Sequence, residues 1–306
     1  MILSPIEQSI KRKIEAVGTP LKDWDIQINY GIKTGCNEAF IISTEKRNEI
    51  LNNCKDADER SRTEDIIRPI LRGRDIKRYG YDWANLWLIA TFPAQHYDIE
   101  DYPAVRDYLL SFAEDNLREA GYDWVADGYL ADFCKQKLAQ TGKFIEIEGK
   151  RITLSNTPEK ARKKTSNKWF ETQDSISYWE DFLKQQIVWI ELSDEPKFAL
   201  IENIMSVNTV FFMTGGHIRH LLGLLNSKLI TWYFKHCIGT TSGVGTNRWL
   251  KYTIEQIPMA PVCQRIEELS LRLSRSYNQE TNQEIDISVC RLYSLNDKEI
   301  SYIVSQ

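Results

Sequence analysis

The sequence predicts an α+β fold in which helices at the two ends of the chain pack together beside a mixed central sheet. Three observations predict this class. A capped amphipathic helix begins the chain, a long stretch near its end has helical spacing, and the segments between them alternate or run apolar as strands do. With 306 residues, of which 42% are hydrophobic, the chain can bury a sizeable core as one large domain or two smaller ones.

The N-terminal helix is predicted from its boundaries as well as from its apolar stripe. Ser4-Pro5-Ile6-Glu7 forms a capping box with proline at the first helical position, and Gly18 supplies a stop. Between them an isoleucine recurs at every fourth residue, at Ile2, Ile6, Ile10 and Ile14. A stripe this narrow needs a partner, so we expect residues 1–20 to form a docking helix.

The region from residue 21 to residue 258 is predicted to be an α+β domain. A leucine-rich helix is expected over residues 218–237, and alternation around Glu148-Gly149 predicts a hairpin over residues 143–154. Strands are expected at residues 24–30, 39–42, 86–90, 187–190 and 207–213.

The last part of the chain, residues 259–306, is predicted to be helical. Apolar residues follow helical spacing from Val262 to Leu292. Asn296-Asp297-Lys298-Glu299 then predicts a new cap for a short terminal helix. We expect this segment to pack on the N-terminal helix, since both carry an apolar stripe that needs covering.

The net charge of −4 conceals an uneven distribution of charge. Residues 97–132 contain ten acids and two bases, whereas residues 135–168 contain ten bases and three acids, and residues 60–78 contain seven bases and three acids. A single charged block is typical of a solvated face. Residues 203–254 contain no acid at all, and this favours contact with a polyanion, because carboxylates would repel phosphate.

Composition also bears on compartment and on metal binding. No stretch approaches the roughly 18 apolar residues of a membrane-spanning helix, and the N-terminus lacks a signal-peptide pattern, so we expect a cytoplasmic protein with no membrane partner. The six cysteines are far apart and include no Cys-x-x-Cys pair. This spacing indicates free thiols rather than a zinc site or a set of disulfides.

Six short segments follow one another in an order that resembles a known family. Two of them read Tyr-Gly-Ile-Lys-Thr-Gly-Cys-Asn-Glu-Ala-Phe-Ile-Ile at residues 30–42 and Ile-Ile-Arg-Pro-Ile-Leu-Arg-Gly-Arg-Asp-Ile-Lys-Arg-Tyr at residues 66–79. The others are Trp169-Phe170-Glu171 and residues 184–189, 221–233 and 254–258. Across roughly residues 24–305 the ordered set resembles the TaqI-like C-terminal specificity domain, the target-recognition region of restriction–modification enzymes that methylate adenine. Gln185 and Gln186 depart from it, since proline and lysine are common there.

The resemblance implies sequence-specific recognition of double-stranded DNA, as in type IIG restriction–modification enzymes. It also implies that catalysis belongs to a methyltransferase or endonuclease domain or subunit that this chain does not contain. Adenine methyltransferases of this class carry an Asn/Asp/Ser-Pro-Pro-Tyr/Phe tetrapeptide, and the sequence has no Pro-Pro pair. We therefore expect no catalytic residue, metal or cofactor in this chain, and S-adenosylmethionine in the missing catalytic domain.

Candidate DNA contacts fall in four segments. Lysine, arginine, hydroxyl and amide groups can bind phosphates or base edges, and glycines permit close approach of the backbone. The candidates are Lys33, Thr34 and Asn37; Arg72, Arg74, Lys77 and Arg78; Lys163, Lys164, Lys168 and Trp169; and Thr240, Thr241, Ser242, Asn247, Arg248 and Lys251.

Each segment also has a structural interpretation. Gly31 and Gly35 suit turn geometry, and an internal ion pair of Arg74 or Asp75 is an alternative to DNA contact. Residues 157–168 could be a solvated loop. Residues 239–251 could be a flexible connection. A nucleotide-binding loop is the other alternative, although the segment lacks the Gly-Lys-Ser/Thr ending of a P-loop.

Three alternative functions remain open at this stage. Glu148-x-Lys150 with Asp132 upstream has the composition of a metal-dependent nuclease site, although Glu148-Gly149 also suits a hairpin turn. Three histidines suggest a metal site, but without neighbouring cysteines or carboxylates capping and packing roles are favoured; they are His217, His220 and His236. The third alternative is a protein-interaction module that uses its apolar terminal helices.

Overall fold

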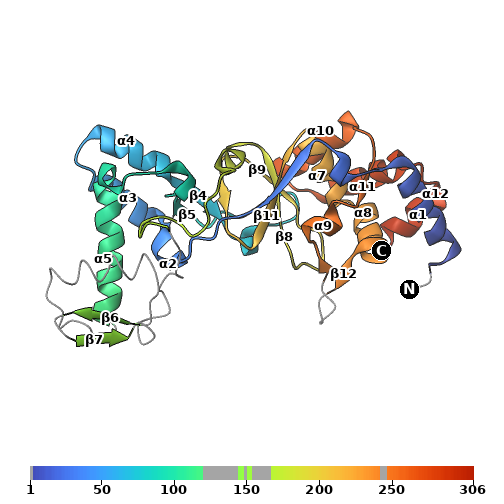
Figure 1. Cartoon of the computed structure of the whole chain (residues 1–306). Helices are drawn as coiled ribbons and strands as arrows, with labels where there is room; N and C mark the ends of the chain where they lie inside the picture. The colour runs from blue at the N-terminus through green and yellow to red at the C-terminus, as the bar shows by residue number, and fades with distance from the viewer. Residues whose placement is uncertain (1–2, 120–143, 148–149, 154–166, 242–246) are drawn as a thin grey trace. The chain divides into compact units, whose positions relative to one another are not determined.

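A computed structural model describes residues 3–119, 144–147, 150–153, 167–241 and 247–306. The chain divides into two compact units, whose helices and strands are labelled in Figure 1. Unit 1 comprises Met1–Gly31, Leu71–Ala84 and Glu180–Gln306, and unit 2 comprises Ile32–Ile70 and Asn85–Trp179. Both units are discontinuous in sequence. The boundaries expected from the sequence, after residues 20 and 258, stay a prediction.

An antiparallel sheet with the strand order β2–β11–β8–β9 forms the centre of unit 1. Its strands are β2 (Ile26–Tyr30), β8 (Gln186–Ile190), β9 (Ala199–Ile201) and β11 (Val210–Gly215). The sequence predicted three of them. It missed β9, because three residues are too few to show an alternating pattern.

Aromatic side chains on one face of this sheet continue into the core of unit 1. Tyr30 lies opposite Phe211, and Phe211 lies opposite Trp189, so the three side chains share a face. The rings of Phe211 and Trp189 stack with their centroids 5.5 Å apart. Deeper in the same core, Trp249 stacks on Phe234 with centroids 3.8 Å apart.

Helices share this core with the sheet. They are α1 (Pro5–Val17), α7 (Ile218–Asn226), α8 (Lys228–Tyr233), α9 (Lys251–Ile254), α10 (Gln264–Arg275), α11 (Gln279–Leu292) and α12 (Asp297–Val304), with a π-helical turn η7 (Phe234–Ile238) after α8. The prediction of one helix over residues 218–237 was wrong in detail. The helix breaks at Ser227, whose backbone is extended and whose hydroxyl accepts from the Ile230 N–H at 3.2 Å.

The family-like segment at residues 254–258 forms no single strand. Ile254 ends α9, and only Pro258 belongs to a strand, β14 (Pro258–Met259). That short strand pairs with β1 (Thr19–Pro20). A further two-residue strand, β10 (Met205–Ser206), precedes β11.

The two ends of the chain lie side by side in unit 1, as α1 and α12 show in Figure 1. The Glu299 carboxylate accepts hydrogen bonds from the Ser9 hydroxyl at 2.7 Å and from the Lys13 ammonium at 2.6 Å. Burial opposes the charge of Glu299, but the hydrogen bonds outweigh it and lower the pKa of this carboxyl group. Ile10 and Ile14 are fully buried, so the stripe of the N-terminal helix is covered by this chain itself.

Unit 2 contains the antiparallel strands β3 (Ile41–Ser43), β4 (Ile67–Leu71) and β5 (Leu86–Ile89), with β5 between the other two. It also contains the hairpin strands β6 (Phe144–Ile147) and β7 (Lys150–Thr153), which confirm the hairpin predicted over residues 143–154. Its helices are α2 (Asn37–Phe40), α3 (Thr44–Asn52), α4 (Ala57–Ile66) and α5 (Pro103–Glu119).

The sequence prediction was weakest in unit 2. Residues 39–42 were expected to form a strand, but Ala39 and Phe40 end α2 and the strand begins at Ile41. Helices α3 and α4 were not predicted, because their polar sequences carry almost no apolar stripe. Their caps are nevertheless present: the Asp56 carboxylate accepts from the Glu59 N–H at 2.8 Å.

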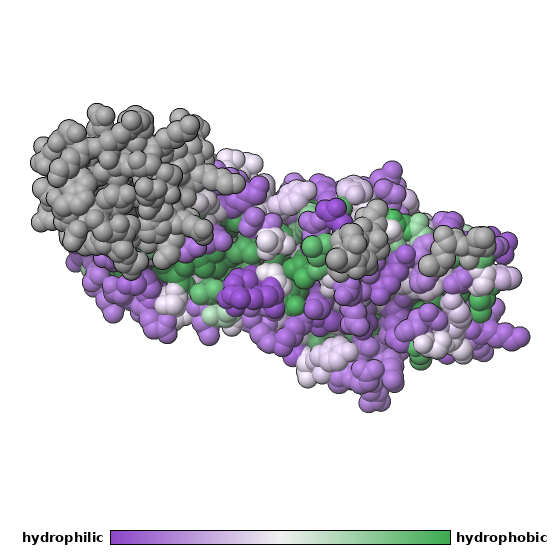
Figure 2. All heavy atoms as spheres, turned by 90° about the horizontal axis from the view of Figure 1, so that it is seen from below, coloured by the Kyte–Doolittle hydropathy of each residue, from purple (hydrophilic) through white to green (hydrophobic). Residues whose placement is uncertain are grey.

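The α+β class predicted from the sequence is confirmed. Most of the coloured surface on the face shown in Figure 2 is hydrophilic, with hydrophobic areas between polar ones. Among the helices that the structure describes, none has both the length and the apolar character needed to cross a membrane. The five cysteines of the described part are free thiols, as their spacing indicated.

Candidate nucleic-acid interface

The loop at residues 33–37 in unit 2 contains one buried candidate residue and two exposed ones. Thr34 is only 1% exposed; its hydroxyl donates to the Asn37 side-chain oxygen at 2.7 Å and accepts from the Cys36 N–H at 3.2 Å. Gly35 has a φ of +82°, which favours glycine. Lys33 and Asn37 are exposed. Thr34 therefore shapes the loop, while Lys33 and Asn37 face solvent.

Residues 167–173, also in unit 2, form a turn that is closed by two hydrogen bonds. The Lys168 N–H donates to the Glu171 carboxylate at 2.7 Å, and the Glu171 N–H donates back to the Lys168 carbonyl at 3.0 Å. The Lys168 ammonium lies 5.6 Å from the centre of the Phe170 ring, and Trp169 meets the same ring edge-on. Glu171 and Phe170 are buried, whereas Lys168 is exposed and Trp169 is half-buried.

The structure brings these two segments of unit 2 together, although 129 residues separate them in sequence. The Gln173 N–H donates to the carbonyl oxygens of Lys33 and Thr34, at 3.2 and 3.1 Å. The Asn167 amide in turn donates to the Gln173 carbonyl at 2.9 Å. We call the resulting group the lysine–asparagine surface, and it consists of Lys33, Asn37, Lys168 and Trp169.

The first cation of the arginine motif, residues 72–78 in unit 1, is held by a carboxylate. Arg72 forms a bidentate pair with Asp75, with Nε–Oδ2 and Nη2–Oδ1 distances of 2.8 Å each. These hydrogen bonds lower the pKa of the Asp75 carboxyl group, which is 8% exposed. The alternative of an internal ion pair is confirmed for Asp75, and the 3₁₀ turn η2 (Gly73–Asp75) brings its carboxylate back to Arg72.

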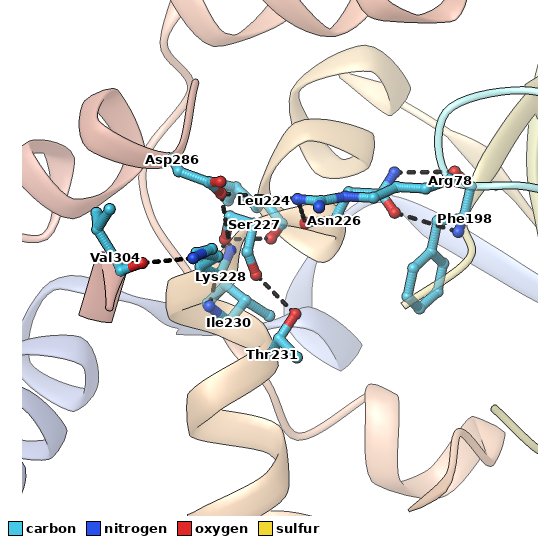
Figure 3. Close-up of polar contacts among 10 residues, drawn as sticks. All are labelled: Arg78, Phe198, Leu224, Asn226, Ser227, Lys228, Ile230, Thr231, Asp286 and Val304. Atoms are coloured by element: carbon cyan, nitrogen blue, oxygen red, sulfur yellow. Dashed lines mark hydrogen bonds and ion pairs between the residues drawn. The ribbon is translucent and has the colours of Figure 1, made fainter. Parts of the chain in front are cut away.

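Arg78 is fixed at the junction of α7 and α8, as Figure 3 shows. Its Nη2 donates to the Asn226 carbonyl oxygen at 2.5 Å and lies 3.7 Å from the Asp286 carboxylate. That carboxylate also accepts from the Lys228 N–H at 2.8 Å. Burial raises the pKa of the Asp286 carboxyl group, even though Lys228 and Arg78 act in the opposite direction. Arg78 thus connects its own segment to the end of α7 and to α11.

The family-like Asn226-Ser227 pair belongs to the same junction. The Asn226 side chain exchanges two hydrogen bonds with the backbone of Phe198, at 2.8 and 3.2 Å. Lys228 donates from its ammonium to the Val304 carbonyl oxygen at 2.5 Å. The segment at residues 221–233 therefore carries fold-determining polar contacts, which periodicity alone does not reveal.

The remaining two cations of the arginine motif are both exposed. Lys77 pairs with Asp82 on the surface. Arg74 lies close enough to Asp75 to help lower its pKa, but within the described residues no hydrogen bond or ion pair holds the Arg74 side chain. Of this motif, Arg74 has the guanidinium best placed to reach a separate molecule.

Residues 239–251 were expected to form a loop, and the structure shows a hairpin stem. Strands β12 (Thr240–Thr241) and β13 (Asn247–Arg248) pair antiparallel, with Thr240 opposite Arg248. The call on Ser242 falls outside the described residues, as do those on Lys163 and Lys164. For Thr240 and Thr241 the structure describes the backbone only.

The hairpin stem is held to the end of β8. The Trp249 N–H donates to the Glu191 carbonyl oxygen at 2.7 Å, and its indole N–H donates to the Ser193 carbonyl oxygen at 2.9 Å. Arg248 bonds the Glu191 carboxylate at 3.0 and 2.5 Å. Lys251 donates to the Ile28 carbonyl oxygen at 3.0 Å. The buried indole of Trp249 anchors the stem, a role that no pattern in the sequence marks.

The structure does not test the nuclease alternative. Asp132 and Glu148 fall outside the described residues, and so does the side chain of Lys150. His220 is buried; one ring nitrogen faces the Ala260 carbonyl oxygen at 3.0 Å, and burial lowers its pKa. This confirms the packing role expected for His220. In the part of the chain that the structure describes, no three His, Cys, Asp or Glu side chains could hold a metal ion together.

Residues 129–259 match the family model for the TaqI-like C-terminal specificity domain. The resemblance inferred from short segments is therefore confirmed for this part of the chain. The matched range contains Trp169-Phe170-Glu171, the α7–α8 junction and the hairpin stem. It does not contain the two segments at residues 30–42 and 66–79.

Solved structures with a similar fold include the type IIL restriction–modification enzyme MmeI in complex with DNA, with a TM-score of 0.51 and 12% identity. The type IIG restriction endonuclease BpuSI has a TM-score of 0.56 and 10% identity. The similarity covers 94% and 98% of this chain, but only 37% and 32% of those two proteins. The chain thus spans about a third of their length, and the likeness shows the fold. The search of curated proteins gave no match.

Proposed function

We propose that this chain is the DNA target-recognition region of a restriction–modification enzyme that methylates adenine. The match of residues 129–259 to the TaqI-like C-terminal specificity domain carries the proposal. The two solved structures support it, because restriction–modification enzymes share this fold over nearly the whole chain.

In this proposal each unit supplies one DNA-contacting surface. In unit 2 the lysine–asparagine surface combines the ammonium groups of Lys33 and Lys168 with the amide of Asn37. The ammonium groups bind phosphates, and the amide can pair with a base edge such as that of adenine. Backbone hydrogen bonds fix both loops before DNA arrives, so less conformational entropy is lost on binding.

The hairpin stem supplies the surface of unit 1. The buried Trp249 and the pair between Arg248 and Glu191 fix the base of the stem. A hairpin on a rigid base can enter the major groove of DNA, which is wide enough for a two-stranded ribbon. Lys251, just after the stem, adds positive charge beside it.

Catalysis would belong to a methyltransferase or endonuclease domain or subunit outside this sequence. No Pro-Pro pair is present to build the tetrapeptide that holds the flipped adenine. S-adenosylmethionine would bind to that catalytic part. The chain described above would select the sequence and position the DNA for it, in the cytoplasm.

The first experiment measures binding of the purified chain to a mixed-sequence duplex by fluorescence anisotropy, between about 50 and 200 mM salt. Affinity should fall as salt rises, because phosphate contacts release counterions. Selection from randomised duplexes should then enrich a defined sequence. Lack of DNA binding at the lowest salt would contradict the proposal and favour a protein-interaction module.

A second measurement separates recognition from chemistry. The purified chain is incubated with duplex DNA and labelled S-adenosylmethionine, and transfer of label to adenine is counted. We expect no transfer. Methylation by this chain alone would overturn the assignment of catalysis to another part.

A further inference from the structure

A small pocket with a cationic lining lies in unit 1, and none of the comparisons assigns a role to it. Its volume is about 290 Å³, and its wall includes Arg78, Lys228, Lys235 and the Thr231 hydroxyl. One carboxylate, Glu195, also lines it. We call it the cationic pocket. Three cationic side chains outnumber the Glu195 carboxylate in the wall and the Asp286 carboxylate that lies 3.7 Å from Arg78, and this balance favours a small anion.

Two of these cations are held in place before any ligand binds, as Figure 3 shows. Arg78 is fixed by the Asn226 carbonyl and Lys228 by the Val304 carbonyl, each at 2.5 Å. An ammonium has three N–H donors and a guanidinium has five, so each group keeps donors for a second acceptor. Lys235, in η7, is exposed and completes the set from the solvent side.

The pocket lies beside the hairpin stem. The Ser193 N–H donates to the Asn247 carbonyl at 3.2 Å, and the Asn247 amide donates to the Asp194 carbonyl at 3.3 Å, directly before Glu195. On the other side of the stem, η7 carries Lys235 and leads through Gly239 into β12. The elements that enclose the pocket therefore also hold both strands of the hairpin.

We propose that the cationic pocket binds one backbone phosphate of the DNA that the hairpin contacts. This inference rests on the proposed function. A phosphate next to a base-reading element fixes the register of the protein on the duplex, whereas the bases supply the sequence. Arg78 binds the phosphate through its fork, and Lys228 and Lys235 bind it as point charges.

The test uses two substitutions in the full chain, one that removes a positive charge and one that removes a negative charge. DNA affinity is measured for each across a salt series. Lys235→Gln should lower the affinity about three- to tenfold at about 50 mM salt and reduce the slope of log affinity against log salt by about 0.9, the value for one lost phosphate contact. Glu195→Gln should raise the affinity, because it removes the carboxylate of Glu195 from the pocket wall.

Lys298→Gln is the matched control. Lys298 is exposed and lies at the start of α12, whereas Gln306, which lines the pocket, follows the other end of that helix. It should leave the slope unchanged. Equal slopes for Lys235→Gln, Lys298→Gln and the unsubstituted chain would overturn the phosphate site while leaving the proposed function standing. Failure of the unsubstituted chain to bind DNA would instead remove the proposed function itself.

Discussion

The arginine motif and the lysine–asparagine surface differ in how their charges are used. Both come from segments that resemble the same family, and both are rich in groups that could bind DNA. In the arginine motif, Arg72 and Arg78 have carboxylate partners within the protein, at Asp75 and Asp286. On the lysine–asparagine surface, the hydrogen bonds go mainly through the backbone, and the side chain of Lys33 extends into solvent.

This difference shows that the role of a charged residue depends on its partners in the fold and not on its residue type alone. A guanidinium in a bidentate pair with a buried carboxylate, as Arg72 is with Asp75, must give up that pair before its fork can bind a phosphate. A lysine whose backbone is fixed gives up little on binding. The comparison predicts that loss of the internal carboxylate pairs of Arg72 and Arg78 lowers mainly stability, and that changes on the lysine–asparagine surface lower mainly DNA affinity.

The largest effect is expected for Asp286→Ala, at the junction that holds Arg78. The substitution leaves the Lys228 N–H without its acceptor and Arg78 without its carboxylate, so the free energy of unfolding should fall by about 2–3 kcal/mol. Urea denaturation followed by circular dichroism measures the change. A loss below about 0.5 kcal/mol, the usual range for surface substitutions, would show that the junction is not structural.

Asp286→Asn is the matched control. It keeps an acceptor for the Lys228 N–H and has no charge to bury. Burial raises the pKa of Asp286, so the charged form is disfavoured in the folded state. The protonated form of Asp286 therefore stabilises the folded state at low pH. This stabilisation is lost as the pH rises through the pKa that Asp286 has in the folded state. At neutral pH we therefore expect Asp286→Asn to lose much less stability than Asp286→Ala.

The second prediction concerns the pair between Arg72 and Asp75. Arg72→Met should lower the free energy of unfolding by about 1–2 kcal/mol near pH 7, because Asp75 loses two charge-assisted hydrogen bonds. Arg72 lowers the pKa of Asp75 in the folded state. The pair therefore stabilises the fold above the unfolded pKa of about 3.9, and this stabilisation is lost as the pH falls through the lower, folded pKa.

Unfolding at several pH values between about 7 and 3 tests this assignment. The difference between the unsubstituted chain and Arg72→Met should shrink towards low pH. Arg72→Lys serves as the control, since it keeps the charge but cannot form the bidentate pair, and it should fall between the two. A difference that stays constant with pH would mean that Arg72 stabilises the fold by packing.

Elements with clear boundaries could be predicted from the sequence. The capping box at residues 4–7 and the alternation before Tyr30 gave α1 and β2, since these patterns depend on neighbouring residues alone. The break at Ser227 could not be predicted, because leucines continue on both sides of it and hide the change of backbone. Helices α3 and α4 were missed because their stability comes from caps and tertiary contacts.

The candidate site was harder to predict than the fold. The sequence identified Lys33 and Lys168 as candidates, but their proximity depends on hydrogen bonds from Gln173, which no motif marks. Arg72 and Arg78 were candidates for the same reason as Arg74, and only the folded chain shows which of them have internal partners. Pairing between distant residues is set by topology, and a single sequence contains no direct record of it.

The third prediction tests whether Thr34 shapes the loop. Thr34→Val removes the hydroxyl that accepts from the Cys36 N–H and donates to Asn37, while keeping the volume nearly the same. The free energy of unfolding should fall by about 1 kcal/mol, measured by thermal or urea denaturation. Thr34→Ser keeps the hydroxyl and should lose less. Equal losses for both variants would indicate that the methyl group matters and the hydrogen bonds do not.

The smallest change in free energy, and the sharpest test of the comparison, is expected for Lys33→Gln. Because the Lys33 side chain is exposed, unfolding should change by less than about 0.5 kcal/mol. DNA affinity at about 50 mM salt should nevertheless fall about three- to tenfold, and the salt slope by about 0.9. Lys55→Gln, an exposed lysine elsewhere in unit 2, should change neither quantity. If Lys33→Gln and Lys55→Gln bind DNA equally well, exposure and a fixed backbone do not suffice to identify a DNA-contacting lysine, and the lysine–asparagine surface loses its assigned role.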